Sequence, residues 1–313
     1  MKIGLIDVDG HNYPNLPLMK ISAWHKQRGD SVEWYSPLFS GHMDIVYMSK
    51  VFSFTPDYEY YIDADEIKKG GTGYAITTIN HRECYEKMND KNLDDEIEHI
   101  YPDYSLYPEQ TKDTAYGFLT RGCPRGCDFC HVANKEGRIS QKVADLSEFW
   151  REQKNIELLD PNLLACTEWK DLLNQLIKSK ARVNFNQGLD IRMMTEEKAE
   201  MLSHIKLNKI HFAWDRYVVK EYIKPKFIEF RKRSTINNHK LQVYVLCGDR
   251  EKKLREEDLY RVYWLRDNGY APYVMLYDKD NIPKGHDLRR FQRYVNNRMI
   301  FWKISDFSEY VSR

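Results

Sequence analysis

Alternating strand and helix signals run through residues 115–313 and constrain the fold more than any other feature of the chain. Short apolar runs recur along this stretch, with helical stretches between them. The predicted strands are 116–119, 156–159, 182–185, 209–213, 242–246 and 273–276. The predicted helices are 146–153, 169–178, 196–204, 219–232 and 256–268. Strands that alternate with helices in this way predict an α/β fold with a parallel sheet and right-handed crossovers.

The first hundred or so residues have a different rhythm. Strand signals at 2–7, 32–35 and 45–48 and an amphipathic helix at 16–28 predict a small doubly wound α/β domain. A polar stretch rich in Tyr and Pro, 101–114, marks the boundary. We therefore predict two domains, 1–112 and 113–313, the second ending in a helical tail.

Three cysteines lie close together directly after the first predicted strand of the second domain. Cys123, Cys127 and Cys130 are spaced C-x3-C-x2-C, with Gly122 and Gly126 beside them. Three thiolates on one short loop can hold three irons of a [4Fe–4S] cluster and leave the fourth iron open to a small molecule. The glycines allow the tight turns that aim the sulfurs inward.

A zinc knuckle is the alternative for these cysteines. Zinc requires four tetrahedral ligands, and His131 would have to be the fourth. His131 directly follows Cys130, which makes convergence of both on one ion awkward, so the cluster is the favoured interpretation. Cys84, Cys166 and Cys247 are scattered along the chain and are predicted to be packed thiols.

The cysteine spacing, the flanking glycines and the aromatic Phe129 before the third cysteine resemble the radical S-adenosylmethionine (SAM) superfamily. The resemblance implies a (β/α)6 partial barrel, with the cluster loop at the face where ligand sites collect. It implies that the open iron binds SAM and that Phe129 lies near the adenine. It further implies reductive cleavage of SAM to a 5′-deoxyadenosyl radical, which abstracts hydrogen from an unidentified substrate. An electron donor such as flavodoxin or ferredoxin is the implied partner.

Polar residues beyond the second and third predicted strands are candidate SAM ligands. Asp160 ends the second strand, with Asn162 beside it, and suits the SAM ammonium or a ribose hydroxyl. Asn186 belongs to an amide-rich exit from the third strand. The alternative for the Asp-Pro-Asn segment is ordinary turn chemistry.

Two further candidates have equally plain alternatives. Arg192 can pair with a carboxylate through two hydrogen bonds, or form a surface ion pair with Asp190 or Glu196. Gly248, at the end of the fifth strand, can let the backbone approach the adenine, or simply make a turn into the next helix.

The N-terminal domain resembles a shortened form of the cobalamin-binding-like domain that precedes many radical SAM cores. Asp9-Gly-His11 comes close to the D-x-H-x-x-G motif of such domains, in which the histidine ligates cobalt, but Pro14 replaces the final glycine. Gly70-Gly-Thr-Gly73 can cradle a phosphate or make a tight turn. We expect that SAM cleavage by this chain needs no cobalamin.

Composition sets the remaining expectations. The 48 basic and 47 acidic residues nearly cancel, so net charge does not indicate a nucleic-acid partner. No apolar run approaches the roughly 18 residues of a membrane span, and the N-terminus lacks a signal-peptide pattern. With reduced cysteines, this predicts a cytoplasmic enzyme. The alternative function is a non-catalytic zinc or Fe–S module that contacts nucleic acid through the basic segments 224–240 and 289–298.

Overall fold

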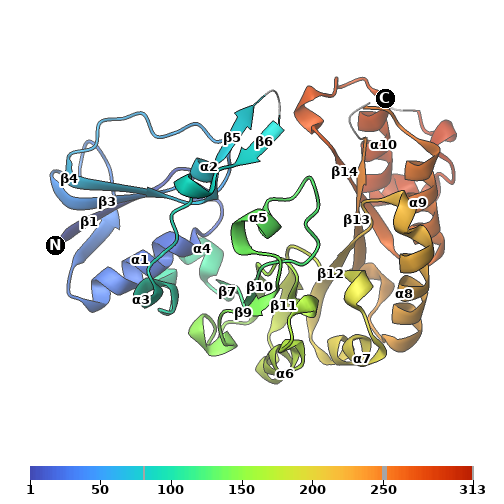
Figure 1. The fold of residues 1–313 in the computed structure, drawn as a ribbon, viewed down its shortest axis with the longest axis horizontal. Coiled ribbons are helices and arrows are strands. Elements are labelled where there is room, and N and C mark those ends of the chain that lie inside the picture. The colour runs from blue at the N-terminus through green and yellow to red at the C-terminus, as the bar shows by residue number, and fades with distance from the viewer. Residues whose placement is uncertain (80–81, 249–251, 312–313) are drawn as a thin grey trace. The chain divides into compact units, whose positions relative to one another are not determined.

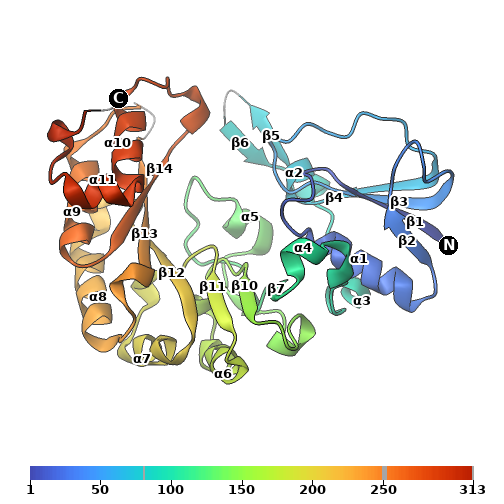
Figure 2. The same ribbon diagram turned by 180° about the vertical axis from the view of Figure 1, so that it is seen from behind.

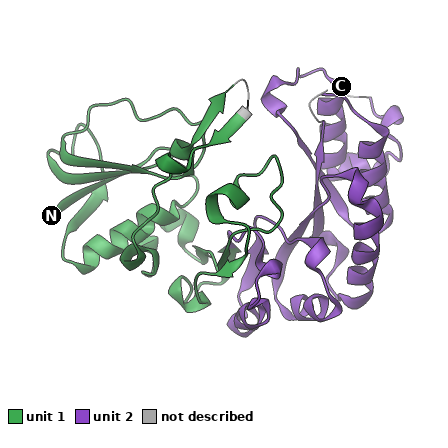
Figure 3. Ribbon diagram, in the orientation of Figure 1, with its two compact units in different colours: residues 1–157 green, residues 158–313 purple. Residues whose placement is uncertain are grey.

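The computed structural model describes residues 1–79, 82–248 and 252–311 (Figure 1). The chain divides into two compact units, Met1–Glu157 and Leu158–Arg313 (Figure 3). The domain boundary at residue 112 remains a prediction. No helix in the described part of the chain is long and apolar enough to cross a membrane.

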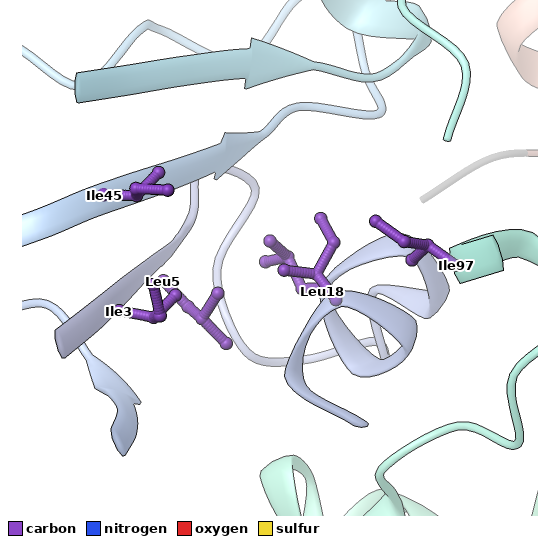
Figure 4. Packing of buried hydrophobic residues seen from close by; sticks show 6 residues of the cluster. Ile3, Leu5, Leu18, Ile45 and Ile97 are labelled. Atoms are coloured by element: carbon purple, nitrogen blue, oxygen red, sulfur yellow. The ribbon is translucent and has the colours of Figure 1, made fainter. Parts of the chain in front are cut away.

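Unit 1 begins with a four-stranded parallel sheet in the order β2-β1-β3-β4. The strands are β1 (Lys2–Asp7), β2 (Ser31–Trp34), β3 (Met43–Ser49) and β4 (Ala64–Gly70). Helix α1 (Leu16–Gln27) packs Leu18 and Ile21 against Ile3, Leu5 and Ile45 of the sheet (Figure 4). The predicted doubly wound arrangement is present.

Strand β4 was not predicted. Its central residues, 65–69, are charged except for Ile67 and are all exposed, so the strand lacks the apolar signal of its neighbours. It is recognisable only through its backbone pairing with β3, at the edge of the sheet. An antiparallel hairpin of β5 (Ile76–Ile79) and β6 (Arg82–Tyr85) follows the short helix α2 (Thr72–Ala75). Two more short helices, α3 (Asp95–Glu98) and α4 (Pro108–Thr111), lead into the second sheet.

The second sheet has six strands in the order β14-β13-β12-β11-β10-β7. They are β7 (Thr114–Gly117), β10 (Asn155–Leu158), β11 (Arg182–Phe185), β12 (Leu207–Ala213), β13 (Leu241–Cys247) and β14 (Ala271–Leu276). The pairs β11–β12, β12–β13 and β13–β14 are parallel. All six predicted strands are therefore present, and strand order follows chain order as in a partial barrel.

Four of the five predicted helices cross over between these strands. They are α6 (Trp169–Ser179), α7 (Glu196–His204), α8 (Lys220–Arg233) and α9 (Glu256–Asp267). Thr195 caps α7 by accepting a hydrogen bond from the Lys198 amide, as predicted. Helices α8 and α9 lie along one face of β12–β14 (Figures 1 and 2).

The remaining prediction, a helix at 146–153, is wrong. Only a 3-10 turn, Leu146–Glu148, forms there. The Phe149 ring packs directly on Gly117, where an added Cβ would lie 2.3 Å from Phe149 Cγ. This contact is made within unit 1 and leaves Phe149 outside helical geometry, with φ at −134°.

Among the described residues, the sheet ends at β14, and no further strand pairs with it. Side chains of α10 (Asp287–Asn296) cover this edge: Asn296 accepts from the Val274 amide at 2.7 Å, and Gln292 donates to the Val274 carbonyl at 3.1 Å. Capping of an edge by side chains keeps the sheet open. A last helix, α11 (Arg298–Lys303), packs on α10 and completes the predicted helical tail.

Candidate functional site

The cysteine loop of unit 1 is held by a short antiparallel ribbon at its base. Strands β8 (Thr120–Arg121) and β9 (Gln141–Lys142) pair on either side of it, and α5 (Val132–Glu136) lies between them. The Cys123 amide donates to the Gly137 carbonyl at 3.1 Å, and the Cys130 amide donates to the Cys127 carbonyl at 3.1 Å. The loop is therefore shaped by its own backbone hydrogen bonds.

Both predicted glycines of this loop adopt left-handed backbone conformations. Gly122 has φ +87°, and a Cβ there would lie 2.1 Å from the Ile139 carbonyl oxygen. Gly126 has φ +57°, and a Cβ there would lie 2.7 Å from the Arg138 guanidinium. Since L-residues with a side chain rarely adopt these angles, both positions favour glycine, and at Gly122 the backbone of Ile139 also fills the space.

The three thiols of the loop are half-buried and not joined by disulfides. Within the described residues, no three Cys, His, Asp or Glu side chains converge on a single metal ion. Three thiolates on one loop are the donor set of a [4Fe–4S] cluster with one open iron, whereas tetrahedral zinc needs a fourth ligand beside them. Phe129 is 38% exposed.

His131 has a structural contact of its own. Its Nε2 lies 3.2 Å from Glu83 Oε2 on β6. Four residues on, the Lys135 ammonium donates to the Thr72 hydroxyl, and burial lowers the pKa of Lys135. These contacts link the segment after the cysteines to the α2–β6 region of the same unit.

In unit 2, the predicted polar residues lie where strands end. Asp160 and Asn162 follow β10 and are only 4% and 2% exposed. Asn186 follows β11, and its side-chain oxygen accepts from Asn184 Nδ2 at 2.5 Å. Asn186 is half-buried. A carboxylate and amides at strand exits can accept from ammonium and hydroxyl groups.

Arg192 is paired with a neighbour in the chain. Its Nε donates to Asp190 Oδ1 at 2.6 Å, and Asp190 also caps the short turn 191–193 by accepting from the Arg192 amide. This is one of the two ion pairs that the sequence offered as an alternative. The Arg192 side chain keeps about a third of its surface exposed.

Gly248 is required by packing within unit 2. Its φ is +73°, and a Cβ there would lie 2.6 Å from Leu288 Cδ1 on α10. The residues directly after it, 249–251, lie outside the described part of the chain, and with them the predicted turn into the next helix.

Sequence reasoning missed a buried ion pair at the strand exits. Arg261 and Asp258, one turn apart on α9, pair at 2.5 Å and are 4% and 5% exposed. Arg261 also donates to the carbonyls of Trp214, Asp215 and Leu246, which ties the ends of β12 and β13 together. The spacing of the pair was visible, but an Asp and an Arg three residues apart on a helix are usually a surface pair.

Asp215, at the end of β12, stands beside this pair. Burial raises the pKa of its carboxyl, while the charge of Arg261 acts in the opposite direction. The carboxyl is thus a protonatable group at a strand exit.

The glycine-rich segment of the N-terminal sheet does not fit a phosphate cradle. A Cβ at Gly71 would lie 2.3 Å from the Lys50 carbonyl oxygen, and one at Gly73 would lie 2.8 Å from that of Phe52. The space next to Gly71 and Gly73 is therefore filled by the chain's own backbone. His11 is exposed, with its ring edge-on to Trp34 at 4.3 Å.

Two of the three aromatic residues interleaved with the basic segment 224–240 are buried, and the third, Tyr222, is 58% exposed. Phe227 and Phe230 are fully buried against Phe212 of β12. Lys226 donates to the Met194 carbonyl, and Arg231 donates to the Ile236 carbonyl. These rings and cations are therefore engaged within the protein, which counts against the nucleic-acid module.

No protein-family model matches the sequence, and no curated protein matches it. Solved structures resemble its fold, among them two radical S-adenosylmethionine enzymes. One is the radical S-adenosylmethionine methyltransferase TsrM from Kitasatospora setae, with cobalamin and a [4Fe–4S] cluster bound. Its TM-score is 0.58 at 11% identity, over 88% of this chain and 74% of TsrM.

The other is the cobalamin-dependent S-adenosylmethionine radical enzyme OxsB, with aqua-cobalamin and S-adenosylmethionine bound. Its TM-score is 0.57 at 12% identity, over 96% of this chain and 56% of OxsB. At such identities the likeness concerns the fold alone. The chain thus shares the α/β fold of these two enzymes, and the strand pattern predicted that class of fold.

Proposed function

We propose that this protein is a radical SAM enzyme. Cys123, Cys127 and Cys130 hold a [4Fe–4S] cluster, and the open iron of the cluster binds SAM. When bound, these groups supply one chemistry: an electron from the cluster cleaves SAM to methionine and a 5′-deoxyadenosyl radical, which abstracts hydrogen from a substrate. The reducing electron comes from a donor such as flavodoxin or ferredoxin, and the protein works in the cytoplasm.

One observation carries this proposal: three half-buried thiols on a single loop that two left-handed glycines shape. The loop leaves the carboxyl end of β7, where ligand sites of parallel α/β folds collect. The fold of the chain, which resembles two radical SAM enzymes, is independent support.

The other residues position SAM. Asp160 is proposed to bind the SAM ammonium or a ribose hydroxyl, with Asn162 and Asn186 donating further hydrogen bonds. Arg192, held by Asp190, is proposed to bind the SAM carboxylate through the guanidinium nitrogens other than Nε. Phe129 and the Gly248 backbone are proposed to border the adenine. Rigid positioning of SAM matters because a misplaced radical reacts with the wrong atom.

Cobalamin is present in TsrM and OxsB, whose fold this chain resembles. We propose nonetheless that this chain cleaves SAM without cobalamin. The support is the glycine segment, whose concave side Lys50 and Phe52 fill. Pro14 in place of the glycine of the cobalt-ligating motif points the same way.

The test is anaerobic reconstitution with iron and sulfide, followed by reduction and incubation with SAM. The proposal expects a brown protein with close to four irons per chain, the composition of one [4Fe–4S] cluster. It also expects formation of 5′-deoxyadenosine without added cobalamin. A protein that binds zinc and no SAM contradicts the proposal and supports the metal-module alternative.

A further inference from the structure

We propose that the face of strands β12–β14 opposite α8 and α9 binds a nucleotide, a flat base joined to a phosphate. This inference deepens the proposed function by naming the substrate class, and it rests on that function only for the reaction that follows binding. The argument uses residues of unit 2 alone.

Strand register places the residues of this face. Alternate residues of β13, Val243 and Val245, are fully buried on the helix side. The residues between them therefore point to the other side. Parallel pairing aligns Ala213 with Tyr244, and Tyr244 with Tyr273, in one row across three strands.

The neighbouring rows are aligned in the same way. His211 pairs with Gln242 in the row before, and Leu246 pairs with Met275 in the row after. The face is therefore aromatic at its centre, with Gln242 as an amide donor and acceptor on one side and apolar side chains on the other.

Aromatic rings on this face form a platform. The His211 and Tyr244 rings are stacked, with centroids 5.1 Å apart and an interplanar angle of 9°. Tyr273 meets Tyr244 edge-on at 5.9 Å and remains 39% exposed, while Met275 is 48% exposed. The small side chain of exposed Ala213 leaves room beside Tyr244 in the same row. Among the three rings, His211 is only 7% exposed and Tyr244 is half-buried, so Tyr273 is the ring that solvent reaches. An exposed aromatic ring can stack on any nucleic-acid base.

Positive charge borders the platform. Lys209 on β12 and Arg298 at the start of α11 are exposed, and neither is in an ion pair within the described residues. Burial lowers the pKa of His211, and the charges of Lys209 and Arg298 act in the same direction. His211 Nδ1 lies 3.2 Å from the Phe185 carbonyl, to which it donates. The two cations beside the platform are therefore without an ion-pair partner among the described residues.

Two cations beside one aromatic platform match a phosphate better than a carboxylate. A phosphate monoester carries a charge of about −1.5 to −2 at neutral pH, whereas a carboxylate carries one negative charge. A nucleotide has both parts: its flat base can stack on the rings, and its phosphate can pair with the two cations.

Calorimetric titration of the reconstituted protein with guanosine 5′-monophosphate and uridine 5′-monophosphate tests this. Saturating SAM is present so that the SAM pocket is filled. We expect both nucleotides to bind, with guanosine, 4-hydroxyphenylacetate and inorganic phosphate each binding much more weakly. No binding of either nucleotide overturns the proposal. If inorganic phosphate binds as tightly as the nucleotides, the rings do not contribute to binding and the proposal is wrong. If 4-hydroxyphenylacetate binds more tightly than the nucleotides, the ligand is an aromatic carboxylate and the proposal is also wrong.

Variants locate the site. Tyr273→Ala is expected to weaken nucleotide binding roughly tenfold, and Tyr273→Phe to keep it, since stacking needs only the ring. Lys209→Gln is expected to weaken binding about fivefold and to reduce its salt dependence. Tyr222→Ala and Lys232→Gln, on exposed positions of α8, are the matched controls and should bind as the wild type does. Controls that lose affinity equally overturn the placement of the site.

Thermal melting of each variant identifies any that fail to fold. If Tyr273→Ala does not fold, the test is made with Tyr273→Phe and Lys209→Gln instead. SAM cleavage by the wild type is measured separately. If SAM is cleaved but no nucleotide binds, only this inference fails. If nucleotides bind but SAM is not cleaved, the proposed radical SAM function fails instead.

Discussion

Two glycine-bearing segments of unit 1 look alike in the sequence and differ in the structure. Around Gly122 and Gly126, left-handed turns present three thiols on a half-buried loop. At Gly71 and Gly73, the glycines allow the backbone of Lys50 and Phe52 to approach. A glycine cluster therefore marks a close approach in both places. At Gly122 and at Gly71 alike the chain's own backbone makes that approach, so only the side chains carried by the segment tell whether a ligand can bind there.

The largest effect is expected when a cysteine of the thiol loop is replaced. Replacing Cys123, Cys127 or Cys130 by Ala should remove most of the iron and abolish 5′-deoxyadenosine formation, because each thiolate binds a different iron. Iron analysis and chromatography of the products measure both effects.

Cys166→Ala is the matched control, since Cys166 is a buried thiol of unit 2 outside the loop. If Cys166→Ala lost its iron to the same degree, the ligand assignment would be wrong.

Substitution of the glycines sharpens the contrast. Gly122→Ala should lower the iron content severalfold, because a left-handed alanine and the Ile139 carbonyl force the loop to move. Gly71→Ala should instead destabilise the protein by roughly 1–3 kcal/mol, the usual cost of a strained backbone, and leave iron binding intact. Iron content and thermal melting separate the two results.

Gly137 and Gly29 are the controls for these substitutions. Both have positive φ, and an added Cβ at either position meets nothing within 4 Å. Each alanine variant should therefore cost only the conformational term, about 1–2 kcal/mol at Gly29. At Gly137, with φ +96° and ψ +168°, the cost should be about 1–3 kcal/mol. Loss of iron from Gly71→Ala in a fully folded protein would erase the distinction between the two segments.

A smaller effect is expected at Arg192. Arg192→Ala should weaken SAM binding by about 1.5 kcal/mol, the low end for a charge-assisted hydrogen bond, because Asp190 already occupies its Nε. Iron content should not change. Calorimetric titration of SAM into the anaerobic variant measures the loss. Unchanged affinity would leave Arg192 as an ion pair only and assign the SAM ligands to Asp160, Asn162 and Asn186.

The smallest expected effect is none. His11→Ala should form 5′-deoxyadenosine at the wild-type rate without cobalamin, because the proposed chemistry does not use the histidine. The comparison is made on protein produced with and without the vitamin. Stoichiometric cobalamin in the wild type, lost in His11→Ala, would show that the N-terminal domain binds the cofactor despite the filled glycine segment.

Patterns of short range were readable from the sequence. The six strands of the second sheet and helices such as α7 follow from apolar periodicity and capping residues, which act within a few residues of each other. The cysteine spacing and its glycines are equally local. What failed was non-local: β4 has exposed, charged residues and exists because β3 pairs with it. The helix predicted at 146–153 is lost because Phe149 packs on Gly117, more than 30 residues away.

The candidate SAM residues divide in the same way. Their places at strand ends could be predicted, because parallel strands expose their carboxyl ends to loops. Their partners could not. The ion pair of Arg192 with Asp190 was one of two choices, and the packing of Leu288 on Gly248 joins residues 40 positions apart.

The sequence by itself determined the local elements, the thiol loop and the class of fold, since each depends on spacing along the chain. The tertiary structure decided which glycines lie against the backbone of another segment and which arginine is buried. It also decided which side chains form the aromatic row on β12–β14. These depend on strand register and on packing across long separations. A shift of one residue in register would turn Tyr244 and Tyr273 to the opposite face of the sheet.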